Sequence, residues 1–211
     1  MEPLLLHACC GPCSTVTVRA WRERDFEPIL LYANPNIHPA SEHARRLAAL
    51  EEFARVADVR LVSVTQPNER DWLAALGATP AEQVRRAEDD TARCAACLGL
   101  RLREAARHAA QRGIPHFATT LTVSPYQRHD LIRLAGAAAE AQFGGEFLDL
   151  DLRPAYRESV AESRRLGLYR QHYCGCVVSK WQSWEGRLAR KAKRASMVGQ
   201  AGGAPVQGGS T

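Results

Sequence analysis

The seven cysteines of this chain fall into three short groups that lie far apart in the sequence. The groups are Cys9, Cys10 and Cys13 in HACCGPC, Cys94 and Cys97 in RCAAC, and Cys174 and Cys176 in YCGC. Their neighbours include Gly, Ala and Pro, which let a backbone wrap closely around an inorganic centre. The pattern predicts a metal or redox site, and only a folded domain that gathers three distant segments can complete it.

Two other uses of clustered cysteines compete with this interpretation. Disulfide frameworks are typical of short secreted chains, whereas this chain has 211 residues and begins with a strand-like LLLHA segment. A disulfide bond is therefore a minor alternative.

A CxxC pair and a second cysteine pair can also form one closed zinc site, but seven thiols exceed what one zinc ion requires. Adjacent residues such as Cys9 and Cys10 should point in different directions, so we expect two neighbouring centres, or one cluster and a free catalytic thiol.

Composition limits the domain organisation and the partners. With 45% hydrophobic residues, the chain can bury a full core, and we expect one α/β metalloenzyme domain over 1–194 and a disordered Gly/Ala/Ser-rich tail over 195–211. No apolar run approaches the roughly 20 residues that span a bilayer, and the N-terminus does not resemble a signal peptide. We therefore expect a cytoplasmic protein without a membrane partner. A net charge of +5 permits a nucleic-acid partner without requiring one.

Short apolar runs alternate with segments of helical periodicity along the chain. The expected strands are 3–8, 27–33, 59–65, 116–122 and 147–151. The expected helices are one capped by Ser14, one capped by Ser41, 68–76, one starting at Thr79-Pro80, 93–111 and 129–143. This alternation predicts an α/β fold with a parallel sheet flanked by helices.

Three motif-rich segments lie at the ends of expected strands. HACCGPC follows the first strand, NPNIHP follows the second, and TTLTVSP spans the fourth and its exit. Ligands collect at the carboxyl ends of strands in an open α/β sheet, so these loops should converge at one edge. Cys94 and Cys97 are three residues apart and share one face of their helix. If that helix and YCGC fold over the same edge, all seven cysteines can meet.

Five motifs in order resemble one known family. They are LLLHACCGPCS, YANPNIHP, RCAACLGLRL, TTLTVSPY and GLYRQHYCGCVVS. Together, from Leu4 to about Ser179, they resemble the epoxyqueuosine reductases of the QueH type, formerly a family of unknown function. The resemblance implies reduction of epoxyqueuosine to queuosine at the wobble position of tRNA, without cobalamin. It also implies a Rossmann-like (HUP-type) scaffold whose helical insertion and C-terminal segment complete a metal site. That site would hold a 4Fe–4S cluster beside a second metal ion, expected to be iron.

The resemblance carries a set of metal ligands onto this chain. The matching cysteines are Cys9, Cys10, Cys94, Cys97, Cys174 and Cys176. The CxxC pair, Cys94 and Cys97, is expected in the cluster, whereas the division of the other thiols stays open. Cys13 is either a seventh ligand or a small buried apolar residue at a helix start.

The implied reaction consumes two electrons and two protons, so it needs an external electron donor, either a reductant protein or a chemical reductant. The candidate catalytic residues are Cys10, Tyr126 and His172, and His7, His38, His129 and Tyr173 also lie near motif loops. For each proton donor, a structural role is the alternative. Asn34 and Asn36 shape the turn after the second strand or reach the substrate.

Recognition of tRNA requires phosphate contacts and a pocket for a flipped-out base. The candidate phosphate ligands are Arg170, Lys180, Arg187, Arg190 and Lys191, and Arg93 or Arg101 could approach the backbone near the cluster. A solvated amphipathic terminal helix, with Trp181 and Trp184 interleaved, is the alternative for the C-terminal basic segment.

Three other functions give different expectations. A non-catalytic, zinc-stabilised RNA-binding protein would be colourless and hold about one zinc ion per chain. A thiol–disulfide oxidoreductase normally carries its CxxC after the first strand of a thioredoxin fold, whereas RCAAC follows a long helical segment. An ATP-dependent RNA-modifying enzyme would need a glycine-rich phosphate loop, and neither GxxxxGK nor SGGxDS occurs.

Overall fold

Five parallel strands form the sheet at the centre of the computed structural model, which describes residues 1–64, 69–75, 77 and 90–201. The strands are β1 (Glu2–His7), β2 (Phe26–Tyr32), β3 (Leu61–Ser63), β4 (His116–Thr119) and β5 (Glu146–Phe147), in the order β3-β2-β1-β4-β5. This is the strand order of a Rossmann-like sheet. The predicted α/β fold class is confirmed.

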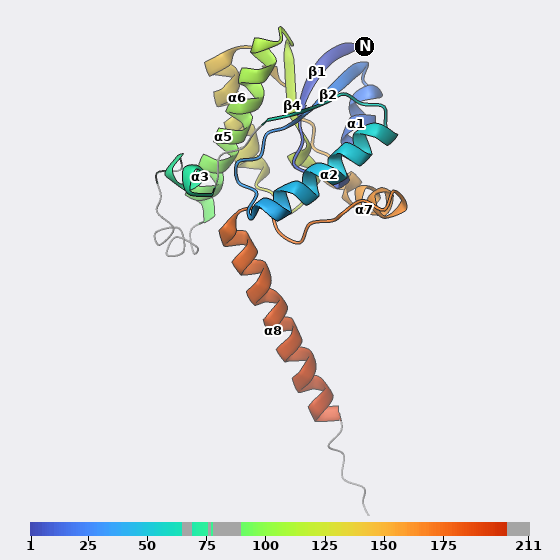
Figure 1. Cartoon of the computed structure of the whole chain (residues 1–211), viewed down its shortest axis with the longest axis vertical. Helices are drawn as coiled ribbons and strands as arrows, with labels where there is room; N and C mark the ends of the chain where they lie inside the picture. Colours follow the sequence, from blue (N-terminus) through green and yellow to red (C-terminus); the bar gives the residue numbers. More distant parts are fainter. Residues whose placement is uncertain (65–68, 76, 78–89, 202–211) are drawn as a thin grey trace, which may run out of the picture.

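Helices cover both faces of the sheet (Figure 1). The described residues form the helices α1 (Gly11–Arg22), α2 (Ala40–Val56), α3 (Glu69–Ala75), α5 (Asp90–Gln111), α6 (His129–Phe143), α7 (Tyr156–Arg165) and α8 (Val177–Ala201), with 3₁₀ turns η2 (Thr120–Val123) and η3 (Arg153–Ala155). Leu5 of β1 packs into the core formed with α5 and α6, whereas Leu4 and Leu6 pack into the core formed with α1 and α2. All three leucines are fully buried, as expected for a strand covered on both faces.

Several predicted boundaries are wrong for local reasons. The fourth strand ends at Thr119, whose hydroxyl accepts a hydrogen bond from the Leu121 amide and starts η2. Helix α1 begins at Gly11, before the predicted cap Ser14, because Pro12 suits a first helical turn. The hydroxyl of Ser14 instead donates to the Cys10 carbonyl at 2.9 Å.

Other elements differ from their predictions in extent. Helix α2 begins one residue before the predicted cap Ser41, with Pro39 in the cap position. The third and fifth strands are shorter than expected, at Leu61–Ser63 and Glu146–Phe147. The helix α7 was not predicted from the sequence. The helix expected to begin at Thr79-Pro80 lies outside the described residues.

Helix α8 projects away from the sheet and its covering helices (Figure 1). It continues to Ala201, so residues 195–201 are helical where a disordered tail was expected, and 202–211 lie outside the described residues. Among the described residues, no helix combines the length and the apolar character needed to cross a bilayer.

Candidate metal centre

The loop after β1 brings three cysteines together at the start of α1. The sulfur atoms of Cys9, Cys10 and Cys13, here called the thiol triad, all lie within 4.8 Å of one another. A single tetrahedral ion with bonds of about 2.3 Å to sulfur holds its thiolates about 3.8 Å apart, so the triad has the dimensions of a site for one ion. The expectation that Cys9 and Cys10 diverge is wrong: Cys10 caps α1 in an extended conformation, and the two sulfurs are 3.6 Å apart.

The three thiols of the triad differ in their tendency to ionise. Hydrogen-bond contacts with Cys10 and Cys13, and the nearby charge of Arg101, hold the pKa of Cys9 well below its usual value. Contacts with the other two sulfurs, together with burial, raise the pKa of Cys13 well above its usual value. One thiolate therefore forms readily, and a bound cation would favour ionisation of the others.

The other four cysteines, here called the thiol quartet, surround a second and smaller space. Cys94 and Cys97 come from the first turns of α5, and Cys174 and Cys176 come from the loop before α8. All four line one cavity of about 30 Å³. The sulfurs of Cys174 and Cys176 are 3.8 Å apart, but among the described residues no three sulfurs of the quartet lie within 4.8 Å of one another. The quartet is therefore wider than the triad.

Hydrogen bonding makes one member of the quartet ionise easily. Contacts with Cys176 and with the Ser179 hydroxyl lower the pKa of Cys174 to about 5, whereas burial raises the pKa of Cys97 to about 11. All seven cysteines are free thiols in this structure. The sulfur–sulfur distances of 3.6 Å between Cys9 and Cys10 and 3.8 Å between Cys174 and Cys176 are much longer than the about 2.05 Å of a disulfide bond.

Arg101 of α5 places a positive charge between the two thiol groups. Its guanidinium is buried and donates to the Asn34 side-chain oxygen at 3.2 Å. Its charge lowers the pKa of Cys9 in the triad and of Cys174 in the quartet. The prediction that Arg101 approaches a tRNA backbone is therefore wrong, because a guanidinium this deeply buried faces thiols and not solvent. It instead offsets the negative charge that ionised thiols create.

Arg46 of α2 holds the loop that carries Cys174. Its guanidinium donates to the carbonyl oxygens of Cys174 and Tyr173, both at 2.9 Å, and its Nε donates to Glu42 at 2.8 Å. The hydroxyl of Tyr169 donates to the other oxygen of Glu42 at 2.7 Å. Arg46 is 1% exposed, so this ion pair fixes the loop from within the protein.

Gly175 lets the same loop approach the turn after β2. Its φ is +134°, a conformation that favours glycine. A Cβ atom at this position would lie 2.9 Å from Cγ1 of Ile37 and 3.0 Å from Nδ2 of Asn36, and the Gly175 carbonyl accepts a hydrogen bond from the His38 amide at 2.9 Å. The geometry therefore requires glycine at the middle position of the CGC sequence.

We expect Gly175→Ala to destabilise the protein by about 1 to 3 kcal/mol from its φ alone, with an added cost from the two close contacts. Chemical denaturation of the full chain measures this change. Gly99→Ala is the matched control, because its Cβ would meet only the flexible end of Arg103 and alanine is the better helix former. Equal stability of Gly175→Ala and the unsubstituted protein would contradict the geometric requirement.

A larger cavity of about 660 Å³ opens beside both thiol groups. Cys9 and Cys13 of the triad and Cys174 of the quartet line it. Tyr126 and Tyr156 line it as well, and their rings pack edge-to-face with centroids 5.9 Å apart. Its volume lies within the range of about 300 to 1,000 Å³ that is usual for small-ligand sites, and the thiols would face whatever enters it.

Comparison with known proteins identifies the family. The family model described as epoxyqueuosine reductase QueH matches residues 4–182. The chain belongs to this family. The match confirms the resemblance that the five motifs indicated, and it places the chain among oxidoreductases.

Curated members of the QueH family are similar over most of the chain. The epoxyqueuosine reductase QueH of Dehalococcoides mccartyi is 33% identical over 180 residues, covering 85% of this chain and 93% of that protein. The QueH protein of Thermotoga maritima is 32% identical, and the match covers 93% of this chain and 100% of that protein. The QueH protein of Streptococcus pyogenes is also 32% identical, and the match covers 92% of this chain and 77% of that protein.

A solved structure supports the fold of this QueH-family chain. It is described as a predicted subunit of a tRNA methyltransferase from Methanocaldococcus jannaschii. The TM-score is 0.51 at 11% identity, with coverage of 78% of this chain and 75% of that chain. At this identity the likeness concerns the fold alone.

The structure separates the candidate catalytic residues of this QueH-family member. Tyr126 and His172 line the large cavity, whereas Cys10 is fully buried and accepts a hydrogen bond from Nε2 of Gln171 at 3.0 Å. Sequence reasoning missed Gln171 and Tyr156, which also line the cavity. Gln171 lies within the quoted YRQHYCGC sequence, which was a usable signal, whereas no motif marked Tyr156.

The buried polar residues at the strand ends have structural partners. His7 bonds Thr119 at 2.9 Å and Asn34 at 3.2 Å, and burial lowers the pKa of His7 to about 3. Asn34 also donates to the Ala8 carbonyl at 2.8 Å. His7 and Asn34 are both fully buried. His7 therefore has a structural role, and Asn34 shapes the loops at the strand ends. His38 and Tyr173 meet through a hydrogen bond from the Tyr173 hydroxyl to the His38 carbonyl.

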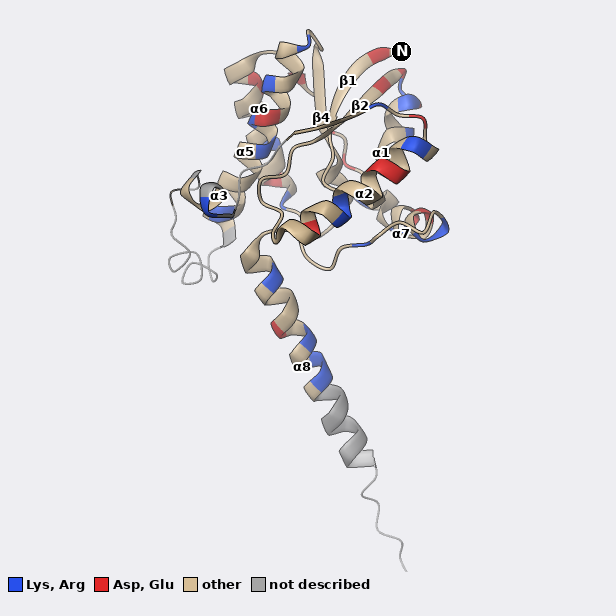
Figure 2. Cartoon of the chain, in the orientation of Figure 1, with Lys and Arg blue, Asp and Glu red and all other residues tan. Residues whose placement is uncertain are grey.

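Basic residues follow the exposed length of α8 (Figure 2). Lys180, Arg187, Arg190 and Lys191 are exposed on this helix, and Arg170 lies half-buried in the loop that precedes it. Arg190 also lines the large cavity. The candidate phosphate ligands therefore extend outward from the cavity mouth.

Proposed function

We propose that this chain reduces the epoxide of epoxyqueuosine in tRNA to the alkene of queuosine, the last step of queuosine biosynthesis. Membership of the QueH family supports this proposal. The observation that carries it is the meeting of two thiol groups at one cavity large enough for a modified base. We place the reaction in the cytoplasm, where thiols stay reduced, and assign it to a unit formed by residues 1–194.

The thiol quartet fits a 4Fe–4S cluster, and the triad fits one further metal ion, expected to be iron. Four cysteines around one cavity are the donor set of such a cluster. Among the described residues, no three quartet sulfurs gather within the 4.8 Å that contains the triad, although those of Cys174 and Cys176 lie 3.8 Å apart. The buried Arg101 offsets part of the added negative charge. Such a cluster supplies single electrons, and a metal ion with an open position polarises an oxygen ligand. This assignment requires no cobalamin.

The side chains of the cavity would bind the base and deliver protons. Tyr126 and Tyr156 offer aromatic faces for a flipped-out base, and His172 or Tyr126 would donate a proton as the epoxide oxygen leaves. Two electrons and two protons are consumed, the carbon–oxygen bonds break, and the oxygen departs as water. The electrons come from an external reductant protein or, in the test tube, from a chemical reductant.

The basic residues of α8 would bind the tRNA backbone. Arg187, Arg190 and Lys191, together with Lys180 and Arg170, present positive charge next to the cavity. Phosphate contacts of this kind fix the orientation of a nucleic acid while the pocket reads the base.

We expect charge reversal of Arg187, Arg190 and Lys191 to weaken tRNA binding at least about tenfold near 0.1 M salt. Loss of three phosphate contacts should also reduce the slope of log affinity against log salt by about 2. The matched control reverses Arg24, Arg60 and Arg112, which are exposed at the opposite end of the sheet. An unchanged affinity and salt slope in the α8 variant would contradict this role.

One experiment tests the whole proposal. The protein is purified without oxygen, and its visible absorption, iron, zinc and sulfide contents are measured. A brown protein that converts epoxyqueuosine in tRNA under a chemical reductant is the expected result. A colourless protein with about one zinc ion per chain and no conversion would overturn it in favour of a zinc-stabilised RNA-binding protein.

A further inference from the structure

Two buried polar side chains in the wall of the quartet cavity have no hydrogen-bond partner in the part of the chain that the structure describes. Within that part, Nε1 of Trp72 and both amide atoms of Asn36 are sealed from solvent and unpaired. Trp72 is 0% exposed and Asn36 is 1% exposed. An unpaired buried N–H group is costly, and a group of this kind in a native protein calls for a ligand or another explanation.

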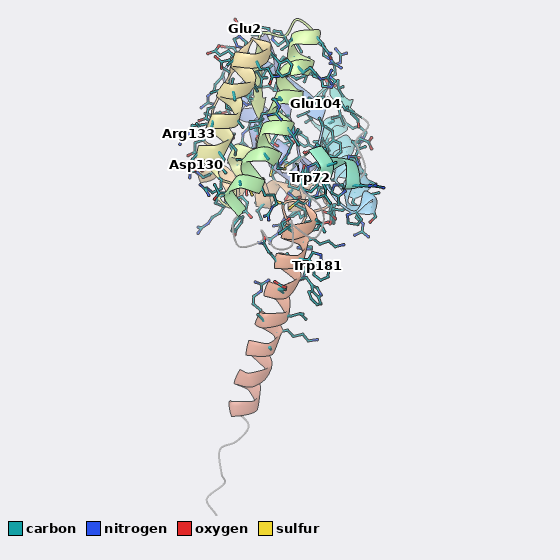
Figure 3. All side chains as sticks on the ribbon, turned by 90° about the vertical axis from the view of Figure 1, so that its left-hand side faces the viewer. Glu2, Trp72, Glu104, Asp130, Arg133 and Trp181 are labelled. Atoms are coloured by element: carbon teal, nitrogen blue, oxygen red, sulfur yellow. The ribbon has the colours of Figure 1, made fainter. Side chains whose placement is uncertain are left out.

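Both side chains lie against the thiol quartet. Trp72 packs in one small cluster with Cys176 and Val178, and Cys97 packs against that cluster from α5. Figure 3 places Trp72 at the lower end of the domain, where α8 begins. Nδ2 of Asn36 is 3.0 Å from the position of a Cβ on Gly175, so the amide lies over the loop between Cys174 and Cys176.

We propose that Trp72 and Asn36 donate hydrogen bonds to the sulfur atoms of the cluster and raise its reduction potential. The inference rests on the proposed function, because the quartet must hold a 4Fe–4S cluster for these sulfurs to exist. Both residues line the same cavity as all four quartet cysteines. Thiolates and sulfides accept hydrogen bonds, whereas the hydrophobic side chains around Trp72 do not.

The direction of the effect follows from charge. Reduction adds an electron to the cluster, and N–H dipoles aimed at its sulfurs stabilise the more negative state. The two residues are therefore positioning groups that tune the electron carrier, and they do not touch the substrate. The donors come from α3 and from the turn after β2, two segments that carry none of the cysteines.

The test uses Trp72→Phe and Asn36→Leu in the full chain, each purified without oxygen. Trp72→Phe removes the N–H and keeps an aromatic ring, and Asn36→Leu removes the amide at similar volume. At a fixed applied potential we expect an about tenfold lower ratio of reduced to oxidised cluster in each variant, which equals about 59 mV for a one-electron couple. The measurement is a potentiometric titration followed by electron paramagnetic resonance.

Leu98→Met is the matched control, because Leu98 lines the same cavity and carries no polar hydrogen. Its potential should equal that of the unsubstituted protein. Pulsed resonance of the reduced protein should also show an exchangeable proton near the cluster that is lost in Trp72→Phe. If Asn36→Leu fails to assemble, Trp72→Phe decides alone.

The outcomes separate the two levels of inference. An unsubstituted protein without any iron–sulfur cluster overturns the proposed function and this inference together. A cluster whose potential is the same in the unsubstituted protein and in Trp72→Phe overturns only the hydrogen-bond role. A shift of equal size in Leu98→Met also overturns it, because general repacking would then explain the change.

Discussion

Replacing Cys97 with alanine should remove the colour of the protein and leave a single metal ion. The thiol quartet supplies the four ligands proposed for the cluster, so loss of one should lower the content from about five iron and four sulfide to about one iron and no sulfide per chain. Reduction of epoxyqueuosine should become undetectable. Metal and sulfide analysis, with the visible spectrum, measures the change.

Cys10→Ala is the matched counterpart from the thiol triad. It should keep about four iron and four sulfide and the brown colour, because Cys10 lies outside the quartet cavity. Turnover should nevertheless fall at least about a hundredfold, since a Lewis-acid metal contributes several kcal/mol to such a step. Loss of sulfide in Cys10→Ala, or retention of the full cluster in Cys97→Ala, would show that the division of ligands is wrong.

Local pattern predicted much of this fold. The buried LLL of β1, the helix 129–143 and the shared face of Cys94 and Cys97 all follow from short-range periodicity. Each of these elements is specified by residues within a few turns of one another. The boundaries that failed, such as the end of β4 at Thr119, depend on a single side-chain hydrogen bond that competes with the strand.

The division of the cysteines could not be predicted from local pattern. It depends on where the loop around Cys174 comes to rest, and that loop is held by Arg46, 128 residues away in the chain. From the sequence, Arg46 is one of many arginines on an amphipathic helix, and its burial becomes visible only when α2 meets the C-terminal loop. The environment of Trp72 could not be predicted either, because only the packing of the folded chain leaves its N–H group without a partner among the described residues.

Arg46→Met should therefore lower stability by about 3 to 5 kcal/mol. The substitution leaves Glu42 as an uncompensated buried charge, with only the Tyr169 hydroxyl to stabilise it. It also removes two hydrogen bonds to the carbonyls of Tyr173 and Cys174. Chemical denaturation of the full chain measures the loss, and iron content should fall with it, because the loop no longer holds Cys174 beside α5.

Two further variants separate the buried charge from general damage to α2. The double variant, Arg46→Met with Glu42→Leu, leaves no unpaired charge, so it should be more stable than Arg46→Met alone. Its loop still lacks the two hydrogen bonds from the guanidinium, so its iron content should stay low. Arg55→Met removes an exposed partner of Glu52 on the same helix, and its stability should match the unsubstituted protein. If Arg55→Met and Arg46→Met cost the same, the clamp on the Cys174 loop does not depend on the buried ion pair.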